Sequence, residues 1–244
     1  WPKFATHLWM KTPDEGLAVV AYAPSAVTAV AGGTTATIEL ETDYPFDDTL
    51  HFRVQTDRPA GFPLLLRIPA WADDAQIAVN GTLRQHPRAG TFCRVEREWR
   101  SGDQVLLTLP MRPAGSRHFN RSLVIERGPL VYGLEIGEEW KRIHADDPMK
   151  ARPHADWEIH PTTPWNYALN VHERDVGALE FVSHGVRACP FSPEGAPISV
   201  KVPGRRLPHW TLDNGAARNI PESPVDSSEP EEALRLIPYG CTNL

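Results

Sequence analysis

The sequence predicts an all-β protein with two antiparallel, jelly-roll-like β-sandwich domains that follow a short helix. Proline makes up 24 of the 244 residues, and because a proline inside a helix costs about 3 kcal/mol, a mostly helical chain is excluded. From Gly16 onward, short segments alternate apolar and polar residues with the period of two that is typical of strands. Turn residues, and no helical segments, lie between these strands, which favours antiparallel sheets over βαβ units.

Residues 1–13 form the predicted helix. Phe4 and Leu8 have the spacing of one helical face, Trp9 extends the apolar stripe, and Pro13 ends it. So short a helix is marginal in water on its own, and its stripe is more apolar than a surface helix needs. We expect it to pack on the following sheet or to be the last piece of a helical domain.

The first sandwich is assigned to residues 14–113. Its clearest strand alternates Leu50, Phe52 and Val54 with polar residues, so these three side chains are expected to face a core. Asn80-Gly81 tolerates positive φ and predicts a tight hairpin turn. The predicted strands are 17–20, 37–41, 50–55, 64–68, 76–79, 92–98 and 105–109.

The second sandwich is assigned to residues 114–244. Two prolines and a glycine mark the boundary within 110–115. Residues 137–164 and 213–233 are predicted to be long polar loops, and the last strand is expected to be cut at Leu244, which makes this domain truncated. The predicted strands are 123–126, 129–135, 167–171, 178–182, 198–202, 207–212 and 234–239.

Charge and hydropathy argue against two classes of partner. The chain has 25 Lys and Arg against 31 Asp and Glu, whereas nucleic-acid-binding domains carry a concentrated basic face. No apolar run approaches the roughly 18 residues that span a bilayer. We therefore expect no nucleic-acid partner and no membrane. No signal peptide is visible at the start, and three widely spaced cysteines suggest reduced thiols in a cytoplasmic protein.

No residue is assigned a catalytic, cofactor-binding or metal-binding role. The ten histidines form no HExxH motif and there is no Cys-x-x-Cys pair; His154 and His160 share a loop without a thiol nearby. Cys93, Cys189 and Cys241 have no neighbouring base that would activate a thiolate. We therefore expect each histidine to be structural or solvated, and no cofactor in this chain.

Asp-Asp and Glu-Glu dipeptides occur five times, but their carboxylates are poor acid/base partners. Neighbours on a strand face opposite ways, and glycosidase carboxylates must face each other across the cleaved bond. We expect solvated turns at these positions. The dipeptides are Asp47-Asp48, Asp73-Asp74, Glu138-Glu139, Asp146-Asp147 and Glu231-Glu232.

Sugar binding is the remaining chemistry, because an indole face stacks on a sugar ring. Aromatic side chains fill cores first, so packing is the more common role for each tryptophan. Asn80-Gly81-Thr82 and Asn120-Arg121-Ser122 match the N-glycosylation pattern, although the first is better explained as a turn. The tryptophans in strand or loop contexts are Trp71, Trp99, Trp140, Trp157, Trp165 and Trp210.

Several segments, in order and spacing, together resemble glycoside hydrolase family 127. This is the β-L-arabinofuranosidase-like family, formerly a domain of unknown function, and the resemblance is to its C-terminal region. It runs along essentially the whole chain. The segments are Trp1-Pro2-Lys3-Phe4, Tyr44-Pro45-Phe46-Asp47, Leu66-Arg67-Ile68-Pro69-Ala70-Trp71 with Val79-Asn80-Gly81, Arg127-Gly128-Pro129-Leu130-Val131-Tyr132, Trp165-Asn166-Tyr167-Ala168-Leu169 and Ile237-Pro238-Tyr239-Gly240-Cys241.

The resemblance implies an (α/α)6 catalytic barrel followed by two β-sandwich domains. It also implies a retaining mechanism with a cysteine nucleophile in a zinc–thiolate site and a glutamate acid/base, all in the barrel. None of these residues has a matching position here, and no cysteine precedes Cys93. Zinc is therefore expected in the missing catalytic domain, and residues 1–13 would be a remnant of the barrel.

Two functions follow from this. As the non-catalytic part of a glycoside hydrolase, the chain would brace the helical catalytic domain of the same polypeptide, which acts on a carbohydrate substrate. It would be inactive alone and would show an apolar patch around Phe4, Leu8 and Trp9. We expect Trp165 and Tyr167 to pack within the domain rather than to reach the active-site cleft of the parent enzyme.

As a carbohydrate-binding module, the chain would instead present two or more coplanar indole rings on one open face. A structural cell-surface repeat is disfavoured because no internal repeat is present.

Overall fold

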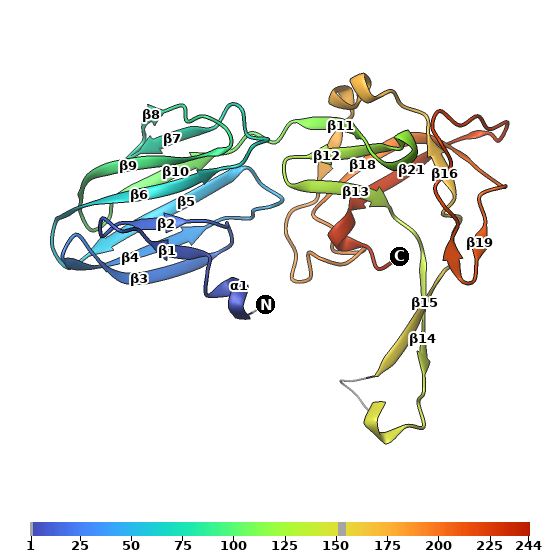
Figure 1. Ribbon diagram of the computed structural model, residues 1–244, viewed down its shortest axis with the longest axis horizontal. Helices are drawn as coiled ribbons and strands as arrows, with labels where there is room; N and C mark the ends of the chain where they lie inside the picture. The colour runs from blue at the N-terminus through green and yellow to red at the C-terminus, as the bar shows by residue number, and fades with distance from the viewer. Residues whose placement is uncertain (1, 151–154) are drawn as a thin grey trace. The chain divides into compact units, whose positions relative to one another are not determined.

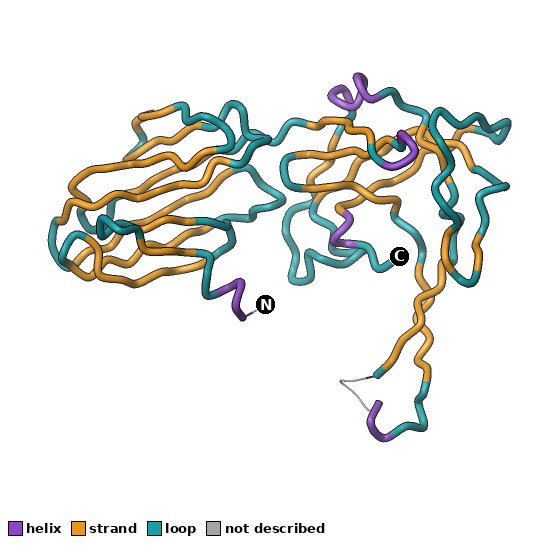
Figure 2. The backbone as a smooth tube through the Cα atoms, viewed as in Figure 1, coloured by secondary structure: helices purple, strands orange, loops and turns teal. Residues whose placement is uncertain are grey.

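The computed structural model describes residues 2–150 and 155–244, and their regular structure is almost entirely β (Figures 1 and 2). The predicted all-β class is confirmed. The chain divides into two compact units, residues 1–112 and residues 113–244.

The first unit is a sandwich of two sheets around one core. All neighbouring strands are antiparallel except β2 and β6, which pair in parallel. The four-stranded sheet has the order β1 (Trp9–Lys11), β2 (Leu17–Val19), β6 (Ala60–Ile68) and β9 (Thr91–Trp99). The six-stranded sheet has the order β3 (Ser25–Ala31), β4 (Thr34–Glu41), β5 (Thr49–Thr56), β10 (Gln104–Thr108), β7 (Gln76–Val79) and β8 (Thr82–Gln85).

The core of this unit follows from the alternation of its strands. Leu50, Phe52 and Val54 of β5 are buried while the residues between them face outward, as predicted. Leu64 and Leu66 of β6 bury against the same cluster from the other sheet. Because burying one large apolar side chain is worth roughly 1.5–3 kcal/mol, this shared core holds the two sheets together.

The predicted helix over residues 1–13 is wrong beyond its first turn. Only Pro2–Ala5 is helical (α1), and the chain then enters β1, where Trp9 pairs with Val19 of β2. Leu8 is buried, and the Trp9 ring meets Phe52 edge-on at 6.1 Å. The strand thus brings Leu8 and Trp9 onto the sandwich core, whereas Phe4 stays exposed. The patch expected around Phe4, Leu8 and Trp9 is therefore reduced, since Leu8 lies inside.

The hairpin predicted at Asn80-Gly81 is confirmed. These two residues join β7 to β8 with φ of 50° and 76°. Positive φ at both central positions is the conformation of a type I′ turn, which matches the twist of the flanking strands. The same dipeptide, Asn214-Gly215, with φ of 51° and 81°, joins the two short strands β19 (Leu212–Asp213) and β20 (Ala216–Ala217) in the second unit.

The second unit is built on a seven-stranded antiparallel sheet. Its buried residues include Ile125, Val200, Val202 and Ile237. The order is β11 (Pro113–Arg117), β12 (Leu123–Arg127), β13 (Leu130–Leu134), β21 (Glu231–Pro238), β18 (Ile198–Arg206) and β16 (Tyr167–Leu169), with β17 (Phe181–Ser183) also paired to β18. Short 3-10 helices are η1 (Phe119–Arg121), η2 (Pro148–Lys150), η3 (Glu173–Ala178) and η4 (Tyr239–Cys241).

Three predictions in this unit are wrong. Residues 137–164 are not one loop, because β14 (Glu138–Ile143) and β15 (Asp156–Pro161) pair with each other across the whole of both strands. The predicted strand at 207–212 is mostly a turn, since the backbone N–H of Trp210 donates to the Leu207 carbonyl. The last strand does not run to Leu244 but ends at Pro238, where η4 begins.

Candidate functional site

Two adjoining pockets open on the second unit, beside the C-terminal end of β18. Their volumes are about 470 Å³ and about 370 Å³. We call the two together the Trp210 groove. The residues that line both pockets are Leu207, Trp210, Pro221, Val225 and Asp226.

Trp210 is held in a fixed orientation. The buried Asn166 side chain donates to the carbonyls of Leu207 at 2.8 Å and of Trp210 at 3.0 Å. The Trp210 indole N–H donates to the Arg218 carbonyl at 2.8 Å. Trp165 meets the ring edge-on, with centroids 5.0 Å apart. Because its N–H is already bonded within the protein, the indole can offer a ligand only its ring surface.

The opposite wall comes from the segment 213–233, which long-range hydrogen bonds fix in place. Ser227 Oγ donates to the Arg206 carbonyl, and Arg205 Nη1 donates to the Glu229 carbonyl at 2.7 Å. Nearer the start of the segment, Asn120 Nδ2 donates to the Ile220 carbonyl at 2.7 Å. The polar loop predicted here is therefore tied down on both sides of the groove.

Several polar side chains in the groove point to ligand binding. Within residues 2–150 and 155–244, the side chains of His209, Asn219 and Asp226 make no hydrogen bond or ion pair. All three are exposed to solvent in the first pocket or at its junction with the second. They supply donors and acceptors around the fixed ring, which is the combination that small-molecule sites use.

Two residues that line the second pocket, Tyr167 and Asn170, already bind carboxylates that are not part of its lining. Tyr167 O–H donates to Glu232 at 3.1 Å, and Asn170 Nδ2 donates to Glu231. Burial, and after it the neighbouring Glu232 carboxylate, raises the pKa of Tyr167 above its ordinary value. Tyr167 lines this pocket. The Glu231-Glu232 pair is bound within the protein and is not poised as an acid and a base.

The other tryptophans divide into core residues and an exposed pair. Trp99 is fully buried and donates to the Phe62 carbonyl at 2.8 Å, and Trp71 packs against the core of the first unit. Trp140 and Trp157, on β14 and β15, are 50 % and 41 % exposed, but their planes cross at 72°. Trp165 and Trp210 also cross at 72°. Neither pair is the coplanar platform that a flat sugar-binding face requires.

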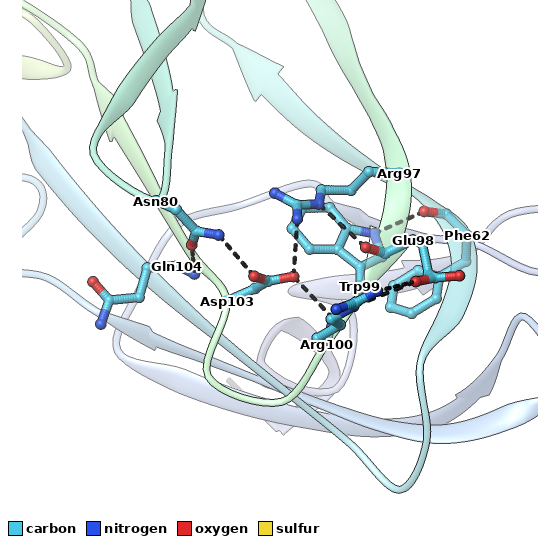
Figure 3. A network of polar contacts seen from close by, with 8 residues as sticks. All are labelled: Phe62, Asn80, Arg97, Glu98, Trp99, Arg100, Asp103 and Gln104. Carbon is cyan, nitrogen blue, oxygen red and sulfur yellow. Dashed lines mark hydrogen bonds and ion pairs between the residues drawn. The ribbon is translucent and has the colours of Figure 1, made fainter.

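A polar network in the first unit, shown in Figure 3, ties two hairpins together. Asp103 accepts hydrogen bonds from Asn80 Nδ2 at 2.7 Å and from the Arg100 N–H at 2.9 Å, and it pairs with Arg97 at 3.5 Å. Desolvation raises the pKa of Asp103, but these hydrogen bonds and positive charges outweigh it and lower the pKa overall. Arg97 also lies over the Trp99 ring, 5.4 Å from its centroid. Because its groups satisfy one another, we interpret the network as structural.

The two N-glycosylation matches have their amides engaged. Asn80 Nδ2 is bonded to Asp103 and Asn120 Nδ2 to the Ile220 carbonyl. A glycan would replace one of the two hydrogens on a nitrogen that already donates within the protein. The structure thus gives both asparagines a structural role.

Two of the three cysteines, Cys93 and Cys241, are poor nucleophiles. Cys93 donates to Gln85 Oε1 and Cys241 donates to the Pro190 carbonyl at 3.2 Å. Burial raises the pKa of both thiols, and a thiol with a raised pKa stays protonated near neutral pH. Cys189 is exposed. In the described part of the chain, no three His, Cys, Asp or Glu residues gather in a way that could hold a metal ion.

Most of the adjacent carboxylates carry turns or ion pairs. Asp47 accepts from Thr49, and Asp74 pairs with Arg112. Asp147 accepts from the Met149 N–H at 2.9 Å. Among the histidines, His160 lies 3.2 Å from Glu158 on the exposed β15, whereas His154 lies outside the described residues.

Comparison with known proteins gives one match to a family model, over part of the chain. Residues 16–111 match the family model described as the β-L-arabinofuranosidase, GH127 middle domain. No curated protein sequence matches the chain. Among the described residues, no helix is long and apolar enough to cross a membrane.

Solved structures extend the likeness beyond the middle domain. A GH127 β-L-arabinofuranosidase from Geobacillus stearothermophilus T6 matches with a TM-score of 0.62 and 21% identity, over 97% of this chain and 33% of that one. A structure described as a glycoside hydrolase gives 0.59 and 21%, over 93% and 34%. A GH127 β-arabinofuranosidase gives 0.53 and 15%, over 94% and 33%. The chain thus spans about a third of these structures, and the GH127 resemblance seen in the sequence segments is confirmed.

Proposed function

We propose that this chain, whose residues 16–111 match the GH127 middle domain, is the non-catalytic β-sandwich portion of a longer glycoside hydrolase. The main support for this proposal is the share of each chain that is matched in the structural comparison. The solved GH127 enzyme from Geobacillus is matched over 97% of this chain but over only 33% of its own length. The remaining two thirds of such an enzyme is where we place the chemistry.

The side chains of this chain support a non-catalytic role. Retaining hydrolysis needs a nucleophile and an acid/base group about 5 Å apart across the scissile bond. The Cys93 and Cys241 thiols have raised pKa values. Glu231 and Glu232 are held by Asn170 and Tyr167. No such reactive pair stands out among the described residues.

The family's zinc site does not fit this chain. A zinc–thiolate centre needs several ligands converging on one point, and no group of three His, Cys, Asp or Glu does so in the described residues. We therefore assign the cysteine nucleophile, the glutamate acid/base and the zinc to a helical domain of the same polypeptide. An arabinofuranoside is the substrate class that the family suggests for that polypeptide.

We assign to this chain the role of bracing that helical domain. Phe4 and Met10 are 53 % and 45 % exposed in the segment that opens the first unit. Exposed apolar side chains of this size are the kind that a neighbouring domain covers. The underlying sandwich, with its shared core, gives such a contact a rigid base.

The experiment compares this chain with a longer polypeptide that adds the helical domain. Both are incubated with a nitrophenyl β-L-arabinofuranoside, with the Geobacillus enzyme as a positive control. We expect release of nitrophenol only from the longer polypeptide. Equal specific activity in the two would overturn the proposal.

A further inference from the structure

We propose that the Trp210 groove binds a neutral sugar of one or two rings, which gives the second unit a direct contact with carbohydrate. The choice of an arabinose-containing probe rests on the proposed function. The binding site itself depends only on features of the groove, which are the fixed indole, the polar side chains around it and the balance of charges.

The indole of Trp210 is preorganised for stacking. Its N–H is bonded to the Arg218 carbonyl, its backbone is held by Asn166, and Trp165 supports it edge-on. An aromatic face carries partial negative charge, which attracts the polarised C–H groups on the apolar face of a sugar ring. Because the ring is already immobilised, binding loses little side-chain entropy there.

The polar side chains around the ring match the needs of hydroxyl groups. Each sugar hydroxyl both donates and accepts, so it is best met by a mixture of acceptors and donors. Asp226 supplies acceptors, while Asn219 and His209 supply both kinds of group, and none of the three has a partner within the described protein. A ligand here would therefore gain hydrogen bonds without breaking any inside the protein.

The size of the groove fits a small saccharide. Its pockets of about 470 Å³ and about 370 Å³ each lie within the roughly 300–1,000 Å³ typical of small-molecule sites. They meet at Trp210 and Asp226. One ring over Trp210 could thus extend toward Tyr167 with a second.

The charges of the groove favour a neutral ligand over a uronic acid or a phosphate. Arg117, in the second pocket, is already paired with Glu173 at 3.1 Å. Arg218, in the first pocket, is accompanied by the carboxylates of Asp226 and Glu229. Anion sites instead gather several unpaired donors, commonly a bidentate arginine. The positive charges of the two arginines are thus offset by carboxylates, so the groove offers a negatively charged sugar no surplus of positive charge.

The test is calorimetric titration of the folded chain with a β-L-arabinofuranosyl disaccharide, followed by xylobiose and galacturonic acid. We expect saturable heat with the neutral disaccharides and a weaker response to galacturonic acid. Trp210→Ala should weaken binding by about tenfold or more. Trp140→Ala is the matched control, because Trp140 is an exposed tryptophan of the same unit that lies outside the groove, and it should leave affinity unchanged.

A second variant guards against misfolding of Trp210→Ala. Asp226→Ala removes an exposed side chain without internal partners, so the fold should survive while affinity falls several-fold. The proposal is overturned if wild-type protein with a native circular dichroism spectrum gives no heat, if Trp140→Ala weakens binding as much as Trp210→Ala, or if galacturonic acid binds more tightly. None of these results bears on hydrolysis, so a failure of the groove is distinguishable from a failure of the proposed function.

Discussion

The side-chain amide of Asn166 donates to the backbone carbonyl of Trp210, 3.0 Å away, from a position that is only 7 % exposed. The same amide donates to the Leu207 carbonyl at 2.8 Å. One buried side chain therefore sets the turn that carries the groove's central ring. This dependence has consequences for stability as well as for binding.

Replacing Asn166 with Ala should destabilise the second unit by about 2–3 kcal/mol, because two hydrogen bonds are lost and the Trp210 carbonyl loses its side-chain donor. Thermal unfolding followed by circular dichroism measures the effect. Asn170→Ala is the matched control, since Asn170 is exposed and binds only the surface carboxylate of Glu231. Similar losses in both variants would contradict the structural role given to Asn166.

Trp9→Ala tests whether the first segment is a strand packed on the sandwich. The Trp9 ring contacts Phe52 and its N–H donates to Ser25 Oγ at 3.1 Å. Its removal should cost about 2–4 kcal/mol of unfolding free energy, in line with truncating aromatic core residues. Trp140→Ala, on β14, should cost well under half of that. If denaturant titration showed no loss for Trp9→Ala, the packing of β1 would be incorrect.

Asp103 should make stability depend on pH in the acid range. Its folded-state pKa is lowered, so the stabilisation is complete above the unfolded value near 3.8 and is lost as the pH falls through the folded value. Asp103→Asn should therefore be less stable than wild type at pH 7, and the gap should narrow below about pH 4. Urea unfolding of both proteins at pH 7 and below about pH 4 measures the difference in unfolding free energy. A difference that grew in acid would contradict the lowered pKa of Asp103.

The thiols should differ in reactivity in the native state. Cys189 is exposed, whereas the pKa values of Cys93 and Cys241 are raised by burial. A thiol-specific colorimetric reagent at neutral pH should modify Cys189 first and reach the other two fully only after denaturation. Cys189→Ser should remove the fast phase. A fast phase that survived in this variant would mean that one of the other thiols is activated.

Local patterns in the sequence are enough to predict much of the fold. The alternation through Leu50, Phe52 and Val54 and the Asn80-Gly81 turn both depend on neighbours in the chain, and both are present in the structure. The prediction of a helix around Trp9 was wrong for a physical reason. The apolar residues there do have helical spacing, but the folded protein supplies a neighbouring strand and a core that favour a strand instead. Tertiary packing outweighs local propensity there.

Local sequence patterns do not predict the Trp210 groove. Its walls depend on hydrogen bonds between residues far apart in sequence, such as Asn120 with Ile220, separated by 100 positions. Composition suggested only that 213–233 was a polar loop. The Asn214-Gly215 dipeptide was the one local signal for a hairpin beside the groove, and it is the same signal that predicted the turn in the first unit.

The decisive measurement is the rate at which the purified chain alone releases nitrophenol from a nitrophenyl β-L-arabinofuranoside. With the reactive groups assigned elsewhere in the polypeptide, the rate should equal that of buffer and should be unaffected by Cys189→Ser. A rate above buffer that scales with the concentration of the chain would contradict the non-catalytic role.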